Sequence, residues 1–266
     1  MKRVTRGARR CGRWVAVVST CSLMLVVATG PANSAGCSFE PQGEGRVVEI
    51  IDARTFRLAD GREVVLAGIE PVVTEKARRT SALSAILAGR DVTLRGEDDT
   101  PDRYGRQPAF VFLASSGTLV QGQLLAQGEA LFSGAVTDKD CASVLTAAEA
   151  EARQTKRGTW ADPTALKNAE SPGDILAGIG RFTVVEGRVL SVRQAGATTY
   201  LNFGRSWTRG FAATISRRMV AAFEAAGTGV KSFENRRIRV RGFVEARGGP
   251  RIELLRVGQV ELLGGN

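Results

Sequence analysis

The chain has 266 residues, of which 43% are hydrophobic and 24% charged, and its formal net charge is +10. This length is enough for two domains of ordinary size. The sequence contains no histidine, which excludes a Ser–His–Asp triad, a histidine-dependent nuclease and a histidine-ligated zinc site. A glycine-rich phosphate loop of the Walker type is also absent from the sequence.

Residues 1–35 have the layout of a secretory signal peptide. Six basic residues and no acidic residue lie within residues 1–13, and an uncharged, mostly apolar run follows from Val15 to Ala28. Small residues then lead to Ser34 and Ala35, where we expect cleavage. The alternative is a membrane anchor, but the run is shorter than the roughly 20 residues that a span needs. We therefore expect a periplasmic or secreted protein with no stable membrane span after cleavage.

Signal cleavage would leave two cysteines, Cys37 and Cys141. Periplasmic and extracellular compartments favour disulfide formation. We predict that these two residues form a disulfide, which would join the mature N-terminus to the helix near the end of the first domain. The alternative is two unpaired, buried thiols.

Charge is distributed unevenly between the two halves of the mature chain. Residues 36–180 hold 16 basic and 21 acidic side chains, a net charge of −5, whereas residues 181–266 hold 15 basic and 6 acidic side chains, a net charge of +9. An anionic polymer is attracted to the positive surface. We therefore expect residues 181–266 to bind a polyanion such as a single-stranded nucleic acid.

The first domain, predicted over residues 36–165, begins with three short strands. Apolar residues cluster in residues 47–51, 56–58 and 64–69, and the turns Asp52–Thr55 and Asp60–Gly61 separate them. This pattern favours a small, curled antiparallel barrel. The remaining elements are a helix over residues 74–89, strands over 91–95 and 109–113, and helices over 120–126 and 141–157.

Three motifs of this region resemble those of the staphylococcal (micrococcal) nuclease family. They are the turn Asp52–Thr55 in place of DGDT, the strand segment LAGI at residues 66–69, and DRYGR at residues 102–106. The resemblance covers residues 45–160 and implies an oligonucleotide-binding (OB) fold with additional helices. In that family, two acidic residues hold a calcium ion against the phosphate, a glutamate activates water, and two arginines stabilise the negative charge that develops on phosphorus.

The resemblance implies five functional positions: one keeps the family's residue, one is changed conservatively and three are lost. Arg106 is retained as one of the two arginines, whereas Val65 replaces the other. Arg54 replaces the first calcium-binding aspartate, and Glu70 supplies an acid at the second calcium-binding position. Arg54 could bind a phosphate directly, or it could be an ordinary solvated turn residue. Arg106 could likewise be structural, paired with an acid such as Asp102.

The position of the general base is also changed. It falls at Val73, or at Val72 in a register that is shorter by one residue, and neither side chain can accept a proton. Glu75 could replace the base if its loop folds back. Losing a member of such a site typically lowers the rate by orders of magnitude. We therefore expect no metal site and no cofactor, and calcium is expected only if the protein is an active enzyme.

Residues 161–180 contain two prolines and little periodicity, and we place a linker within them at residues 166–180. From Arg181 the pattern predicts three strands, a short helix and two further strands, which is the order of a second OB barrel. The predicted fold class is therefore β-rich α+β, with two tandem five-stranded OB-type barrels, the first nuclease-like with additional helices. The second occupies residues 181–266.

Basic and aromatic residues are mixed within the second domain, as in single-strand-binding OB domains. The candidate nucleic-acid-binding residues are Tyr200, Arg205, Trp207 and Arg209. Four further arginines are close together on one predicted strand: Arg236, Arg237, Arg239 and Arg241. We expect Phe203 and Phe211 to be core residues. The alternative to a binding surface is a solvated, arginine-rich face.

These features predict a secreted or periplasmic nuclease-like protein that binds nucleic acid, another anionic polymer or a protein partner without efficient calcium-dependent cleavage. One alternative is an active phosphodiesterase that uses Arg106, Glu70 and a displaced base such as Glu75. Another is a structural envelope protein whose basic domain contacts acidic cell-surface polymers.

Overall fold

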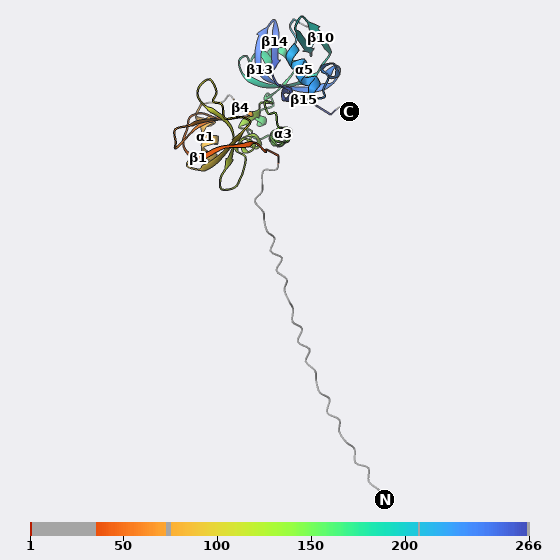
Figure 1. Ribbon diagram of the computed structural model, residues 1–266. Coiled ribbons are helices and arrows are strands. Elements are labelled where there is room, and N and C mark those ends of the chain that lie inside the picture. Colours follow the sequence, from red (N-terminus) through yellow and green to blue (C-terminus); the bar gives the residue numbers. More distant parts are fainter. Residues whose placement is uncertain (2–35, 73–75, 207, 265–266) are drawn as a thin grey trace. The chain divides into compact units, whose positions relative to one another are not determined.

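A closed five-stranded barrel organises the first half of the chain (Figure 1). The computed structural model describes residues 1, 36–72, 76–206 and 208–264, so the expected signal peptide, Val73, Glu75 and Trp207 lie outside the described residues. The barrel strands are β1 (Glu40–Ile50), β2 (Thr55–Leu58), β3 (Glu63–Leu66), β5 (Asp91–Gly96) and β6 (Gln107–Leu113). No helix of the described residues is long and apolar enough to span a membrane.

The barrel strands pair in the order β1-β2-β3-β6-β5, and β1 closes the ring by pairing with both β2 and β5. Register shifts at Pro41–Gly43 and Val47–Glu49 bend β1 so that it reaches both neighbours. The β3–β6 pair is parallel and the other pairs are antiparallel. Apolar side chains such as Phe56, Leu94 and Val111 fill the interior. The prediction of a β-rich first domain with a five-stranded barrel is confirmed.

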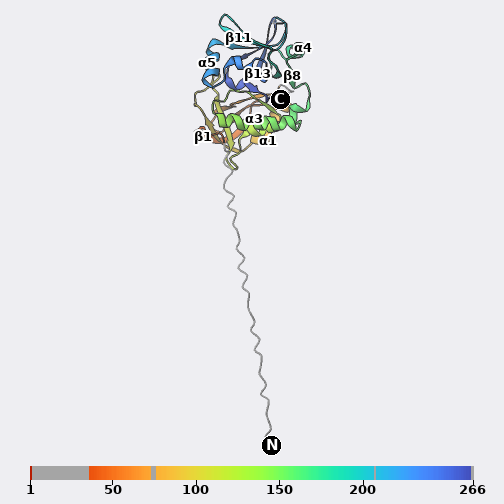
Figure 2. The ribbon, with the colours of Figure 1, turned by 90° about the vertical axis from the view of Figure 1, so that its right-hand side faces the viewer.

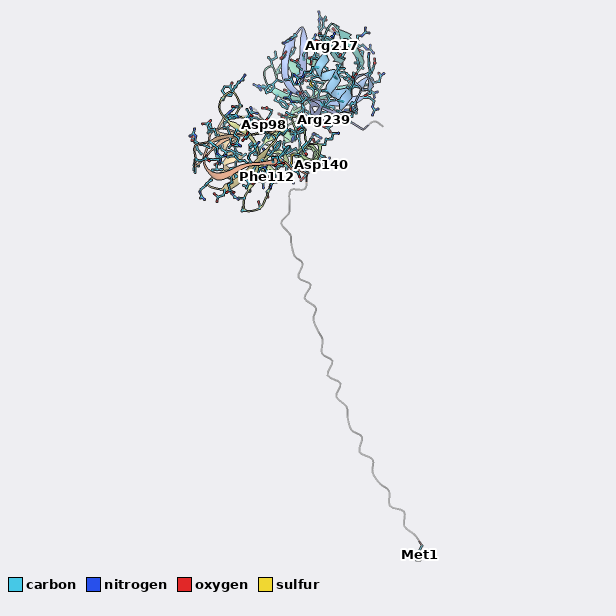
Figure 3. All side chains as sticks on the ribbon, viewed as in Figure 1. Met1, Asp98, Phe112, Asp140, Arg217 and Arg239 are labelled. Carbon is cyan, nitrogen blue, oxygen red and sulfur yellow. A yellow bond between two sulfur atoms is a disulfide. The ribbon has the colours of Figure 1, made fainter. Side chains whose placement is uncertain are left out.

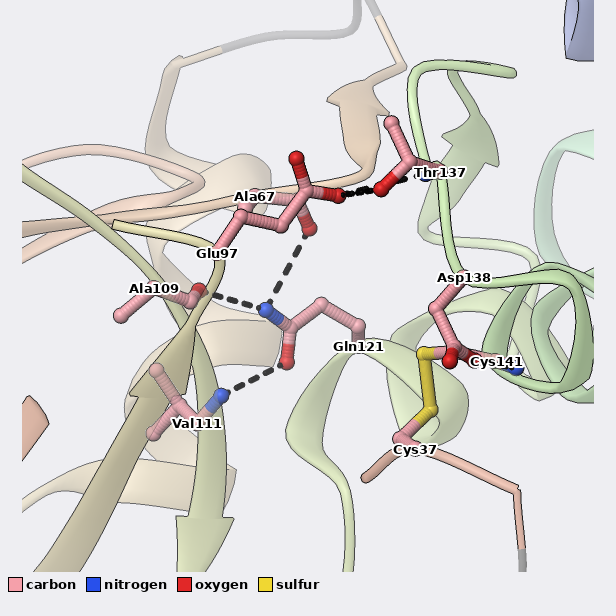
Figure 4. The surroundings of a disulfide bond; sticks show 9 residues. All are labelled: Cys37, Ala67, Glu97, Ala109, Val111, Gln121, Thr137, Asp138 and Cys141. Atoms are coloured by element: carbon pink, nitrogen blue, oxygen red, sulfur yellow. Dashed lines mark hydrogen bonds between the residues drawn. A yellow bond between two sulfur atoms is a disulfide. The ribbon is translucent and has the colours of Figure 1, made fainter. Parts of the chain in front are cut away.

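Helices and a small sheet complete this half of the chain. They are α1 (Lys76–Leu87), α2 (Val120–Ala126), α3 (Lys139–Gln154) and the antiparallel pair of β4 (Ile69–Pro71) with β7 (Ala130–Phe132). Figure 2 shows α3, in green, in a view turned by 90°. The buried Gln121 side chain joins α2 to the barrel, because it accepts from Val111 N and donates to the carbonyls of Ala67 and Ala109 (Figure 4).

The predicted disulfide is present between Cys37 and Cys141, with an S–S distance of 2.05 Å (Figure 4). Both cysteines are buried. Cys141 lies in the first turn of α3, where its backbone N–H donates to the side chain of the N-cap residue Asp138 at 2.6 Å. The bridge therefore ties residue 37, just ahead of β1, to the capped start of α3.

A second, eight-stranded sheet organises the other half of the chain. Its strands are β8 (Leu166–Asn168), β9 (Phe182–Arg188), β10 (Ser191–Ala195), β11 (Thr198–Asn202), β12 (Ala212–Ser216), β13 (Arg237–Arg247), β14 (Gly249–Leu254) and β15 (Val260–Leu262). The order is β10-β11-β12-β14-β13-β9-β8, and β15 pairs with β13. The helices α4 (Pro172–Leu176) and α5 (Arg217–Ala225) accompany the sheet.

The second sheet repeats the pairing of the barrel in part. The order β11-β12-β14-β13-β9 has the same sequence of antiparallel and parallel pairs as β2-β3-β6-β5-β1. The ring does not close in the same way, because Val189 and Leu190 separate β9 from β10, and the pairing path ends on β10 at one side and on β8 at the other. The prediction of a second closed barrel is thus not confirmed.

The segment expected to be a linker, residues 166–180, contains regular structure. Its strand β8 pairs in parallel with β9, and α4 follows. Ala169 and Ile175 are fully buried in the core of the second sheet. Parallel pairing joins residues that are distant in sequence, so a local sequence pattern could not predict this strand.

Three of the four clustered arginines are neutralised by ion pairs. Arg237 and Arg239 both bind Glu186, at 2.6 and 3.0 Å, and Arg239, labelled in Figure 3, also binds Glu261 at 2.6 Å. Arg241 binds Glu149 of α3 at 2.8 Å, and the side chains of both residues are only 1% exposed. Arg239 and Arg241 are therefore buried ion-pair partners that stabilise the fold, whereas Arg237, whose side chain is 60% exposed, pairs with Glu186 at the surface.

Candidate functional site

The turn between β1 and β2 brings Arg54 into contact with Glu70 of β4. Arg54 Nη1 donates to Glu70 Oε1 at 2.9 Å and lies 3.4 Å from the carbonyl oxygen of Ile69. The turn is held by Asp52, whose Oδ1 accepts from the backbone N–H of Arg54 at 2.9 Å. The Arg54 and Glu70 side chains are 30% and 19% exposed. The two side chains thus form a partly buried, charge-assisted pair at one edge of the barrel.

Arg106 forms a second such pair just before β6. Its Nε and Nη2 donate to Asp102 Oδ2 at 3.0 and 2.7 Å, and its guanidinium lies 5.0 Å from the centre of the Tyr104 ring. Asp102 Oδ1 also accepts from the backbone N–H groups of Tyr104 and Arg106. The hydrogen bonds from Arg106 lower the pKa of Asp102, and the same carboxylate raises the pKa of Arg106. The structure therefore shows the pairing of Arg106 with Asp102.

Two of the family's functional positions carry apolar side chains in the described part of the chain. Val65 is buried opposite Thr55 of β2. Val72 packs against the small apolar cluster that contains Leu131 and Trp160. Glu75, the candidate replacement base, lies outside the described residues. Across the part of the chain that the structure describes, no group of three or more Cys, Asp or Glu residues could hold a metal ion.

Acid is expected to weaken the turn over residues 102–106. The pKa of Asp102 in the folded protein lies below its ordinary value of 3.8, so the unfolded chain takes up the proton first. The stabilisation is therefore complete above about pH 5 and is lost as the pH falls through the folded pKa. Urea unfolding should show that Asp102→Asn is less stable than the wild type at pH 6, and that this difference shrinks at pH 3. The exposed Asp99→Asn variant is the control. A difference that stays constant with pH would contradict this linkage.

A separate groove of about 600 Å³ opens on the second sheet, lined by residues of β10 and β11. We call it the β10–β11 groove. Three of its lining residues are arginines, Arg193, Arg205 and Arg251, and its lining includes no acidic residue. Arg193 and Tyr200 are direct cross-strand neighbours, and the Arg251 guanidinium lies 5.0 Å from the centre of the Tyr200 ring. The groove thus combines an aromatic ring with three positive charges.

The structure groups some of the predicted second-domain residues and separates others. Tyr200 and Arg205 both line the β10–β11 groove, whereas Arg209 is exposed and is not part of the lining. Trp207 lies outside the described residues. Phe203 and Phe211 are buried in the core, as expected.

Sequence reasoning missed two groove residues, Arg193 and Arg251. Period-two alternation places Arg193 on the face opposite the buried Val192. That signal could have identified an outward-facing arginine, but its pairing with Tyr200 depends on the register of β10 with β11. Arg251 reaches the groove only because β14 pairs in parallel with β12, which is a non-local contact.

Comparison with known proteins agrees with the architecture of the first half. Residues 74–162 match the family model of the staphylococcal nuclease homologues. This segment is a staphylococcal nuclease homologue domain. Two relatives, each described as an uncharacterized endonuclease, from Escherichia coli O157:H7 and Escherichia coli, are 28% identical to the chain over 124 residues. The matched region is 44% of this chain and 77% of each relative.

The match to the staphylococcal nuclease homologue model includes one charged pair of the candidate site and not the other. Arg106 and Asp102 lie within residues 74–162, whereas Arg54 and Glu70 precede them. The family resemblance predicted from DRYGR and LAGI is confirmed for residues 74–162, which contain DRYGR, whereas LAGI precedes the match. The Arg54–Glu70 contact, in contrast, is a feature of this chain outside the matched segment.

Proposed function

We propose that this protein binds nucleic acid or another anionic polymer without efficient calcium-dependent cleavage. One observation carries the proposal: the Arg54 guanidinium is hydrogen-bonded to Glu70 at 2.9 Å. By the family resemblance, these are the two positions that would hold calcium. Calcium needs six to eight oxygen ligands. A fixed guanidinium about 4 Å away would repel it by on the order of 4 kcal/mol per unit of ionic charge.

The other replacements support the same conclusion. Val65 supplies no positive charge to a developing phosphorane, and Val72 supplies no base. Removing one such stabilising group typically lowers kcat by 10²–10³-fold. Arg106 is the retained residue, but Asp102 already neutralises it. The rival function is a phosphodiesterase that uses Arg106 and Glu70, and it requires both ion pairs to open.

Charge supports binding through the second half of the chain. Residues 181–266 carry a net charge of +9, and arginines such as Arg193, Arg205 and Arg217 take part in no ion pair among the described residues. The strand order of the second sheet supports an OB-type domain there. The buried disulfide supports a periplasmic or secreted location, because disulfides persist in oxidising compartments. A protein partner remains the alternative ligand for this surface.

Calcium should neither stabilise the wild-type protein nor promote cleavage of single-stranded or duplex DNA above background. Arg54→Asp removes the competing cation and adds a carboxylate beside Glu70, so we expect measurable calcium binding by this variant in isothermal titration calorimetry. The variant should still not cleave DNA, because the base and one arginine remain absent. The matched control is Arg90→Asp, which makes the same charge change at an exposed position outside the site.

Two outcomes would contradict the proposal. Calcium-dependent digestion by the wild type, abolished in Arg106→Ala, would establish the phosphodiesterase alternative. Calcium binding by the wild type as tight as that of Arg54→Asp would show that the guanidinium does not exclude the ion.

A further inference from the structure

We infer that the β10–β11 groove is a binding site for single-stranded nucleic acid, with a base stacked at Tyr200 and the backbone phosphates bound by Arg193, Arg205 and Arg251. This inference rests on the proposed function, because it names the site and the class of polymer. It differs from a general attraction to a basic surface, since it requires an aromatic ring and phosphate-binding groups in one place.

The positive charge of the groove is available to a ligand. Among the residues that the structure describes, Arg193 and Arg205 form no ion pair, and Arg251 Nε donates to the neutral carbonyl of Arg247 at 2.9 Å. This contrasts with Arg239 and Arg241, which carboxylates neutralise. Guanidinium groups present several N–H donors in a planar fork that matches phosphate oxygens. The groove can therefore attract and orient a phosphate backbone.

Tyr200 is a neighbour of two of the three groove arginines. It is half-buried, with Arg193 opposite it on β10 and Arg251 over its ring. The hydrogen bond from Arg251 to the carbonyl of Arg247 holds this guanidinium at the ring. A planar guanidinium over an aromatic ring can present its own outer face to a stacked nucleobase. The face of a tyrosine ring is apolar, so stacking on it contributes to binding a nucleobase and not to binding a simple inorganic anion.

The groove also contains neutral polar groups. Asn202 is two positions after Tyr200 on β11, and both residues line the groove. Asn202 Nδ2 donates to Ser191 Oγ at 3.3 Å. An amide and a hydroxyl beside a ring can hydrogen-bond to the edge of a stacked base. The volume of about 600 Å³ lies within the range of small-ligand pockets, roughly 300–1,000 Å³.

A single strand fits these features better than a duplex. The bases of a duplex are stacked on one another and present only their edges, whereas an unpaired base can turn its face to a ring. Acidic polysaccharides and polyphosphate supply charge but no base. The observations therefore favour unpaired nucleic acid, and the role of Tyr200 distinguishes it from the other polyanions.

The test uses the full mature chain, residues 36–266, and fluorescence anisotropy of a labelled 12-nucleotide oligothymidylate at several salt concentrations. Tyr200→Ala should weaken binding by at least about 5-fold at every salt concentration, which corresponds to the loss of about 1 kcal/mol or more of stacking. Tyr200→Phe keeps the ring and should bind as the wild type does. Tyr200→Ala should leave the binding of inorganic polyphosphate unchanged.

The arginine variants should respond differently. Arg193→Gln and Arg205→Gln should each reduce the slope of log affinity against log salt by about 0.7, the value for one phosphate contact on a single strand. Arg256→Gln is the matched control, since it removes the same charge from an exposed position outside the groove, and the slope should stay unchanged. Circular dichroism of each variant checks that the fold is retained.

The outcomes separate this inference from the proposed function. If the wild type binds the oligonucleotide but Tyr200→Ala and Arg193→Gln bind equally well, the groove is not the site, while the proposed function stands. Binding of duplex as tight as that of the single strand would also overturn the inference. If the wild type binds neither nucleic acid nor polyphosphate, the proposed function itself fails.

Discussion

Glu149→Ala is expected to lower the free energy of unfolding by about 3–5 kcal/mol, which is the typical loss when one partner of a buried ion pair is removed. Glu149 Oε2 accepts from Arg241 Nη1 at 2.8 Å, and Glu149 Oε1 accepts from the backbone N–H of Phe132 at 2.8 Å. Without this carboxylate, the buried Arg241 guanidinium keeps Glu261, at 3.3 Å, as its charged partner. Urea unfolding at neutral pH measures the loss.

The same helix supplies a control. Glu151 pairs with Arg157 at 3.2 Å, but both side chains are more than half exposed. Glu151→Ala should therefore cost less than about 1 kcal/mol. The double variant Glu149→Leu with Arg241→Met should recover part of the loss, because the buried Arg241 guanidinium is removed together with its partner. The recovery is partial, because Arg153, 3.6 Å from Glu149, still loses this carboxylate. Equal losses in Glu149→Ala and Glu151→Ala would contradict a stabilising role for the buried pair.

Removing the disulfide should have an effect of similar size. The bridge joins residues separated by 104 positions. On the chain-entropy model, closing a loop of this length stabilises the folded state by about 4–5 kcal/mol relative to the reduced chain. We expect the Cys37→Ala, Cys141→Ala double variant to show this decrease in urea unfolding.

Reductant provides the internal control for that measurement. Dithiothreitol should destabilise the wild type to about the level of the double variant, and it should have no further effect on the double variant. Because both cysteines are buried, reduction of the native protein should be slow without denaturant. A double variant as stable as the oxidised wild type would show that the bridge does not stabilise the fold.

The Glu149–Arg241 pair also bears on how binding is tested. Glu149 belongs to α3, which follows the barrel, whereas Arg241 belongs to β13 of the second sheet. Truncating the chain at residue 180 would remove Arg241 and leave Glu149 without this partner. Point variants of the full mature chain are therefore the appropriate way to assign binding to the barrel or to the β10–β11 groove.

Local sequence patterns were sufficient for several parts of this protein. Alternating apolar residues separated by turn residues predicted the first strands of the barrel, and the compartment argument predicted the Cys37–Cys141 bridge. The substitutions at Arg54 and Val65 were also readable, because they fall inside a recognisable order of motifs. These features depend on the pattern of neighbouring residues or on the residue type at a motif position. Both can be read from the sequence alone.

Only the tertiary structure decided which charges are free. Arg239 and Arg241 look in the sequence like Arg193 and Arg205, yet the first two are neutralised by Glu186, Glu261 and Glu149. The two glutamates that bind Arg241, Glu149 and Glu261, are 92 and 20 positions away in the sequence.

The same holds for the contacts that define the two candidate sites. Arg54 reaches Glu70 of β4, 16 positions away. Tyr200 meets Arg193 through the register of the β10–β11 hairpin, and it meets Arg251 through the parallel pairing of β12 with β14. Composition and alternation specify that a residue is charged or faces outward, but not which group it meets. Long-range strand pairing determines that, and here it separates the arginines that stabilise the fold from those that remain available to a ligand.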